Sequence, residues 1–271
     1  MTIPNLRNIL FALQLLLVPI RAQHNVSGEA ITTRFWDCCK PSCSWRGKAS
    51  VSQPIQDCDI NDAPHNNPNQ GSGCGTGGTA YTCNNQQPWA VNDTLSYGFA
   101  GVFLTGHPET EDFWCCACYQ LDFTSDPLKG KSMIVQASNS AFEVNKVNRF
   151  SLAVPGGNTT SQDACSRQYN VDQSVFGATG SGVGSLDECD RLPEQLRDAC
   201  RWRFDWFQDA QYPTANFHRV ACPKEITDKT KCTRNDEPAF VAGKPSASTV
   251  IAGSSLLAGV PMLLASLLLA Q

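Results

Sequence analysis

Cysteine is the residue that most limits how this chain can fold. The sequence holds 14 cysteines, an even number, all of them between Cys38 and Cys232. In a secreted protein this pattern indicates a framework of disulfide bonds. Zinc binding is the rival explanation for so many cysteines, but the four histidines are scattered along the chain and paired CxxC blocks are absent. The sequence therefore predicts disulfides and no metal site.

Both ends of the sequence resemble targeting signals. Residues 1–22 combine an arginine before the apolar run FALQLLLV with a small residue at Ala22, which is the pattern of a cleaved secretory signal. The apolar run is too short for the alternative, an N-terminal membrane helix. Residues 247–271 close with the uncharged tail LLAGVPMLLASLLLAQ, which is typical of a glycolipid-anchor (GPI) signal with Ser246 as the attachment residue. A C-terminal transmembrane helix is the alternative at this end.

The predicted mature chain, residues 23–246, has the length of one domain. Sequons give candidate glycosylation sites at Asn25, Asn92 and Asn158. We therefore expect a secreted cell-surface glycoprotein held to the outer membrane leaflet by its lipid. The net charge of −4 and the absence of a basic patch exclude nucleic acid as a partner. The glycine-rich stretch 71–78 lacks the lysine of a phosphate-binding loop, and we expect a monomer without a cofactor.

The local patterns predict a β-rich domain with short helices. Residues 117–125 and 131–138 are expected to be strands joined by a DPLKGK turn. The apolar stretch 97–106 fits either a buried strand or a short helix, because its periodicity does not decide between them. Residues 185–202 have the start signal and mixed charge of a helix, which Pro193 is expected to split.

The stretch TTRFWDCCKPSCSW, residues 32–45, crowds three cysteines and two tryptophans around one carboxylate, Asp37. If FWDCC is extended, Cys38 and Cys39 point to opposite faces and pair with different partners. The sequence CCAC at 115–118 repeats this arrangement. One interpretation is that the bridges position Asp37 for chemistry. The alternative is a protein built to survive harsh extracellular conditions.

This stretch resembles the signature of glycoside hydrolase family 45, the small fungal-type endoglucanases. Further blocks resemble the family in its own order, and the resemblance covers residues 32–235. These blocks are GGTAYTC, PWAVND, WCCACYQLDFTS, VPGG, ECDRLP and CRWRFDWF. The resemblance implies a six-stranded double-psi β-barrel, dominated by β structure, with short helices and seven disulfides. The implied bridges are Cys38–Cys165, Cys39–Cys74, Cys43–Cys115, Cys58–Cys83, Cys116–Cys232, Cys118–Cys222 and Cys189–Cys200.

The resemblance also implies hydrolysis of internal β-1,4 bonds in cellulose-like glucans with inversion, and it makes Asp37 the general base. An inverting glycosidase needs a second, protonated carboxyl group about 6.5–9.5 Å away, which donates a proton to the leaving oxygen. The positions that correspond to the substrate groove are Thr33, Phe35, Lys40, Trp45, Arg149 and Ser151. Ordinary core packing is the alternative role for Trp45.

Three groove positions depart from the family pattern. The aspartate that acts as general acid is replaced by Ser151, the histidine before it by Arg149, and a tyrosine by Phe35. Glu143 is the candidate substitute acid, whereas Asp163 precedes Cys165 and is expected to be structural. Because a hydroxyl is too weak an acid for this step, the sequence predicts a weakened endoglucanase. The alternatives are a catalytically inactive, expansin-like glucan-binding or wall-loosening protein and a surface protein with only a structural role.

Overall fold

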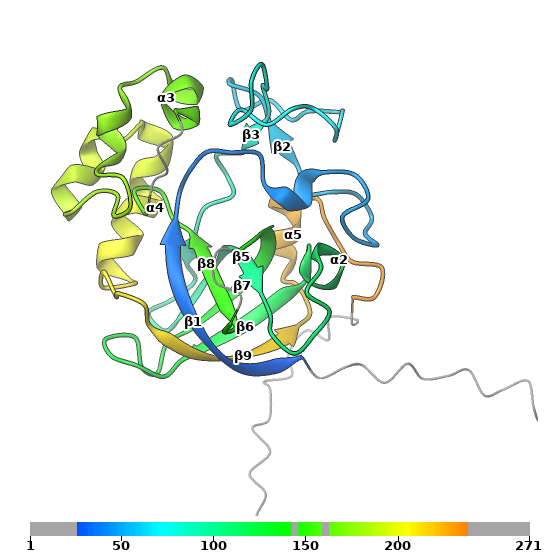
Figure 1. Cartoon of the computed structure of the whole chain (residues 1–271). Helices are drawn as coiled ribbons and strands as arrows, with labels where there is room; N and C mark the ends of the chain where they lie inside the picture. The colour runs from blue at the N-terminus through cyan, green and yellow to red at the C-terminus, as the bar shows by residue number, and fades with distance from the viewer. Residues whose placement is uncertain (1–25, 143–145, 159–162, 238–271) are drawn as a thin grey trace, which may run out of the picture. The chain divides into compact units, whose positions relative to one another are not determined.

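The computed structural model describes residues 26–142, 146–158 and 163–237, all of which lie in one unit of the chain (Figure 1). The two end segments, with Asn25 and Ser246, and the candidate acid Glu143 lie outside the described residues. Within the described part, no helix has both the length and the apolar character needed to cross a membrane.

Nine strands alternate with short helices along the chain. The strands are β1 (Ser27–Phe35), β2 (Asp57–Cys58), β3 (Tyr81–Thr82), β4 (Trp89–Ala90), β5 (Leu95–Phe103), β6 (Cys118–Phe123), β7 (Ser132–Ser140), β8 (Arg149–Ala153) and β9 (Thr214–Val220). The helices are α2 (Glu111–Trp114), α3 (Ala164–Tyr169), α4 (Glu194–Asp205) and α5 (Lys224–Thr230), and the 3₁₀ turns are η2 (Ser42–Ser44), η3 (Gln173–Phe176) and η4 (Leu186–Arg191). In Figure 1, α3 and α4 lie on one side of the strands and α2 and α5 on the other.

Six of these strands close into a barrel in the order β5–β7–β6–β9–β1–β8. The ring is closed by antiparallel pairing of β8 with β5, in which Ser151 faces Gly101. The pairs β1–β8 and β5–β7 are parallel and the other pairs in the ring are antiparallel, so the barrel is mixed. Closure leaves these strands without a free edge. The expected six-stranded barrel with short helices is confirmed.

The barrel interior is filled by alternate side chains of its strands. Three aromatic rings pack together there. The ring centroid of Tyr119 lies 5.4 Å from that of Phe150 and 6.1 Å from that of Phe217, and the centroids of Phe150 and Phe217 are 5.2 Å apart. All three side chains are buried. Such ring pairs add stability beyond the area they bury. On β8, therefore, Phe150 points inward while its neighbours Arg149 and Ser151 are left on the outer face of the barrel.

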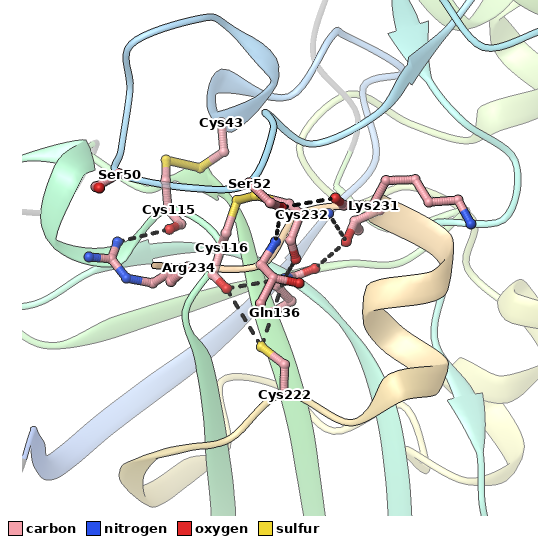
Figure 2. Close-up of a disulfide and its surroundings, with 12 residues drawn as sticks. Cys43, Ser50, Ser52, Cys115, Cys116, Gln136, Cys222, Lys231, Cys232 and Arg234 are labelled. Carbon is pink, nitrogen blue, oxygen red and sulfur yellow. Dashed lines mark hydrogen bonds between the residues drawn. A yellow bond between two sulfur atoms is a disulfide. The ribbon is translucent and has the colours of Figure 1, made fainter. Parts of the chain in front are cut away.

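Seven disulfides tie the strands to the segments between them. The bonds are Cys38–Cys165, Cys39–Cys74, Cys43–Cys115, Cys58–Cys83, Cys116–Cys232, Cys118–Cys222 and Cys189–Cys200, which are the same seven pairs that the resemblance implies. Figure 2 shows how two bridges leave the neighbouring residues Cys115 and Cys116 in different directions. Beside them, the side-chain amide of Gln136 donates hydrogen bonds to the carbonyl oxygens of Cys116 and Cys232, at 3.1 and 3.0 Å.

The local geometry of the tandem cysteines differs from the extended strand that the sequence predicts. Strand β1 ends at Phe35, and Cys38 has a left-handed backbone conformation with φ of +59°. Cys116, in the second tandem pair, has φ of +66°. In each tandem pair, the sulfurs point in different directions because one of the two cysteines has a left-handed backbone conformation. The alternation of side chains along a strand is not the cause. The expectation of different partners holds, but its proposed cause was wrong.

The remaining element predictions agree with the structure. Residues 117–125 contain β6, residues 131–138 cover most of β7, which extends to Ser140, and the undecided stretch 97–106 lies mostly within β5. Pro193 separates η4 from α4 and precedes the first residue of α4. Proline is tolerated at a helix start because the first N–H groups of a helix have no intrahelical acceptor.

Candidate active site

Asp37 lies two residues beyond the end of β1, with its side chain partly exposed. Its Oδ1 accepts a hydrogen bond from the backbone N–H of Cys39 at 2.9 Å, and the N–H of Trp36 donates to the carbonyl oxygen of Asn158 at 2.9 Å. The next two residues carry bridges to Cys165 and Cys74, in different parts of the chain. The carboxylate is therefore held by covalent and backbone contacts while one side of it stays accessible to solvent.

The outer face of the β1–β8 pair brings together three of the predicted groove residues. Thr33 is the register partner of Ser151, and the Oγ1 of Thr33 donates to the Oγ of Ser151 at 2.9 Å. The Nε of Arg149 donates to the same Thr33 oxygen at 3.3 Å. From the other neighbouring strand, Gly101 faces Ser151 and offers no side chain to cover it. Ser151, where the family resemblance implies a missing general acid, thus lies in a small polar cluster with Thr33 and Arg149.

Lys40, a predicted substrate-binding position, makes its contacts inside the protein. Its side chain is fully buried, and its Nζ lies 2.7 Å from Asp57 Oδ2. The same Nζ donates to the carbonyl oxygens of Pro68 and Gln70 at 2.7 and 3.0 Å. The ammonium group of Lys40 is therefore held inside the protein, next to Trp45, whose ring centroid lies 4.1 Å from Nζ.

Trp45 is not a core residue, because its side chain stays partly exposed. It lines a pocket of about 460 Å³ together with residues of the 46–57 loop and His65. The Nδ1 of His65 lies 2.9 Å from Asp57 Oδ1, so Asp57 holds both Lys40 and His65. Sequence reasoning missed Asp57 and His65, since neither belongs to a recognisable motif and the ion pair joins segments that are separate in the chain.

A second pocket, of about 290 Å³, lies against β1 and β8. It is lined by Thr33, Arg34, Arg149 and Arg203, and by the 209–213 segment that leads into β9. In the sequence, Asp37 stands between the β1 residues that line this pocket and the residues Cys43 and Trp45 that line the first. Phe35, the third departure from the family pattern, is partly buried and packs against the cluster that contains Trp36 and Cys38.

The other candidate positions have simple surroundings. Asp163 is an exposed residue that pairs with Arg167 one helical turn later, as expected of a structural carboxylate. Asn92 and Asn158 have exposed side chains. Among the residues that the structure describes, one group of potential metal ligands comes together, formed by Cys58, Asp62 and Cys83. The two cysteines are bonded to each other, so neither can supply a thiolate to a metal.

The closed mixed barrel with its seven bridges is the fold of a solved cellulase-type hydrolase, described below. Residues 28–233 match the model of Glycosyl hydrolase family 45, and the chain belongs to this family. A Fusarium oxysporum protein that carries the name endoglucanase type K is 48% identical to this chain over 222 residues. These residues are 82% of this chain and 58% of that protein. The chain thus spans little more than half of that relative.

Other relatives are matched over nearly their whole length. An endoglucanase of Cryptopygus antarcticus is 42% identical over 212 residues, which cover 78% of this chain and 92% of the relative. An endoglucanase of Phaedon cochleariae is 35% identical over 218 residues, which cover 80% of this chain and 88% of the relative. The crystal structure of the cellulase from the springtail Cryptopygus antarcticus superposes with a TM-score of 0.72 at 42% identity, over 77% of this chain and 98% of that one.

Proposed function

We propose that the chain is an endo-β-1,4-glucanase that cleaves cellulose-like glucans with inversion and uses Asp37 as the general base. The observation that carries this proposal is the anchored and partly exposed carboxylate of Asp37 in a family 45 barrel. The names of the relatives, endoglucanase and cellulase, support the substrate class. Asp37 lines neither pocket, but in the chain it lies close to lining residues of both, namely Thr33 and Arg34 of one and Cys43 and Trp45 of the other.

In this mechanism the ionised Asp37 takes a proton from a water molecule as that water attacks the anomeric carbon. The hydrogen bond from the Cys39 N–H to Oδ1 helps to hold this carboxylate in place. The aromatic face of Trp45, held from one side by Lys40, would stack on a sugar ring. Thr33, Arg149 and Ser151 would contact sugar hydroxyls, and Phe35 supplies an apolar edge.

The weak step is protonation of the leaving oxygen. Ser151 is a hydroxyl bonded to Thr33, and it is too weak an acid to give up its proton near neutral pH. Loss of a general acid costs a glycosidase about 10²–10⁴ in rate. We therefore propose a slow enzyme. Glu143 is the substitute acid that we propose from the sequence.

A second candidate function is binding of glucan without hydrolysis, as in expansin-like wall-loosening proteins. The Ser151–Thr33 hydroxyl pair favours it, because two hydroxyls can bind a sugar yet cannot catalyse its departure. The pockets and Trp45 would serve binding equally well in either case.

We also propose where the protein acts. Residues 1–22 would direct secretion, and residues 247–271 would be exchanged for a lipid at Ser246. The domain 23–246 would then face outward from the membrane, with glycans on Asn25, Asn92 and Asn158. Treatment of expressing cells with a phosphoinositide-specific phospholipase should release the protein into the medium, whereas a transmembrane helix would keep it on the cells.

The test of the function compares the purified wild-type protein with Asp37→Asn. Reducing-sugar release from barley β-glucan and retention on insoluble cellulose are measured side by side. A slow release that Asp37→Asn abolishes would support the hydrolase. Retention without any release would support the binding protein. A release that Asp37→Asn leaves unchanged would refute the assignment of the base.

A further inference from the structure

The pocket beside β1 and β8 has an unusual concentration of positive charge. Three arginines from three different elements line it: Arg34 on β1, Arg149 on β8 and Arg203 on α4. One carboxylate, that of Asp209, is also in the lining. Three positive charges and one negative charge leave the lining with a charge of +2. The whole chain carries −4, so this charge is a local feature of the pocket.

Two of the arginines are already engaged by the protein. The buried Arg203 donates from Nε to Asp209 Oδ1 at 2.8 Å, and from one terminal nitrogen to the carbonyl oxygens of Gly156 and Val183 at 2.7 and 2.9 Å. Arg34 lies 3.5 Å from the same carboxylate oxygen and donates to the Ala210 carbonyl. Both guanidinium groups line the pocket, and both form ion pairs with the single carboxylate among its described lining residues.

Arg149 is engaged less completely. Its side chain donates from Nε to Thr33 Oγ1, and within the described part of the chain it forms no ion pair with a carboxylate. Among the residues that the structure describes, none engages its two terminal nitrogens, which could therefore bind a ligand in the pocket. A guanidinium group uses these nitrogens to form paired, charge-assisted hydrogen bonds with a carboxylate.

The surroundings favour a negative ligand. Burial, together with the nearby charge of Arg203, lowers the pKa of Arg34 to about 10, so this group remains protonated at neutral pH. Protonated arginines in a partly buried pocket repel one another, and an anion between them would relieve this repulsion. The volume of about 290 Å³ lies at the small end of the range for ligand pockets, which suits a single sugar unit.

We propose that this pocket recognises a uronic acid unit of the glucan, with Arg149 binding its carboxylate. The inference rests on the proposed function, because the pocket shares Thr33 and Arg149 with the polar cluster around Ser151 and would act as a subsite of the same groove. It narrows the substrate class from neutral β-1,4-glucans to chains that bear carboxylated sugars. Arg149 is then a specificity-determining residue, and the charge at this position has a role that a neutral side chain could not supply.

The test measures binding by calorimetry in the Asp37→Asn background, which prevents cleavage during the experiment. The ligands are cellohexaose and the same oligosaccharide oxidised at C6 to glucuronate units, each at two salt concentrations. Wild type at position 149 is expected to bind the oxidised ligand about tenfold more tightly or better, which corresponds to 1.4 kcal/mol. Salt should reduce this preference, since part of it comes from charge.

Two substitutions assign the preference to the pocket. Arg149→Gln should bring the ratio of the two dissociation constants close to one, whereas Arg149→Lys should keep part of the preference. Lys129→Gln changes the net charge equally at an exposed turn outside the pocket and should leave the ratio as in the parent. Circular dichroism shows that each variant is folded.

Several outcomes would overturn the inference. Equal affinity of the parent for both oligosaccharides would refute the uronate subsite while leaving the proposed glucanase intact. A preference that survives Arg149→Gln, or that Lys129→Gln also removes, would refute the role of Arg149. Inorganic phosphate that binds as tightly as the oxidised ligand would indicate a general anion site. Failure of both oligosaccharides to bind would refute the inference together with the glucan groove.

Discussion

Restoring a carboxyl group at position 151 is the sharpest test of the proposed mechanism. Ser151 lies on the outer face of β8, and its register partner on β5 is Gly101, which has no side chain to obstruct a larger residue. The Oγ1 of Thr33, 2.9 Å from the present hydroxyl, could donate to a new carboxylate. Ser151→Asp should therefore fold normally and place an acid opposite the water that Asp37 activates.

The size of the gain depends on Arg149. A general acid contributes about 10²–10⁴ in rate, but only while it is protonated. Arg149 contacts the same Thr33 oxygen at 3.3 Å, so it lies close enough to lower the pKa of an aspartate at 151 by about 1–3 units. Above that pKa, each further pH unit reduces the protonated fraction tenfold. We expect a gain of about a hundredfold near pH 5, a smaller gain at pH 7, and roughly tenfold more activity when Arg149→His is added.

The assay is reducing-sugar release from barley β-glucan between pH 4 and pH 8. Ser185→Asp adds the same charge at an exposed position outside both pockets and should leave the rate unchanged. Adding Asp37→Asn to Ser151→Asp should remove the gain. A folded Ser151→Asp protein whose rate stays within about threefold of wild type at every pH would refute the argument that a proton donor is missing here.

Three further changes test the rest of the site. Asp37→Asn keeps an oxygen that can accept the hydrogen bond from the backbone but removes the base, so the residual hydrolysis rate should fall by about a hundredfold or more. Asp57→Asn leaves the buried ammonium of Lys40 without its counter-charge and should cost about 3–5 kcal/mol, measured by urea unfolding, whereas Asp228→Asn at an exposed ion pair should barely change the midpoint. Trp45→Ala should raise KM by about threefold to tenfold with little change in kcat, as expected from the loss of a stacking contact.

Sequence patterns were sufficient where neighbouring residues decide the structure. Strand β6 was predictable because Tyr119, Leu121 and Phe123 alternate with polar residues, and this alternation is what a half-buried strand requires. The break before α4 was predictable because proline disrupts the interior of a helix. The general location of the site followed from a motif in which Asp37 is flanked by cysteines.

Features that depend on distant segments were not predictable from the sequence. From the motif alone, Lys40 would be expected to face solvent. In the structure it forms a buried ion pair with Asp57. The positively charged pocket is assembled from Arg34, Arg149 and Arg203, and no sequence window contains all three. In each case the decisive interaction is an electrostatic contact formed only after the barrel closes, so no local pattern reports it.

The structure also shows why the side chain at position 151 can change while the barrel remains intact. Phe150 and Leu152 point into the core and determine the packing of β8, whereas Ser151 between them faces the outside. A change of the side chain at 151 would therefore leave the core packing of β8 intact, and the disulfides constrain the chain at other positions. The residues that stabilise the barrel and the position that the family resemblance assigns to the general acid lie on opposite faces of one strand. If the proposed mechanism holds, the cysteine framework of a related chain reports its fold, while the residue at the position of Ser151 reports its capacity for catalysis.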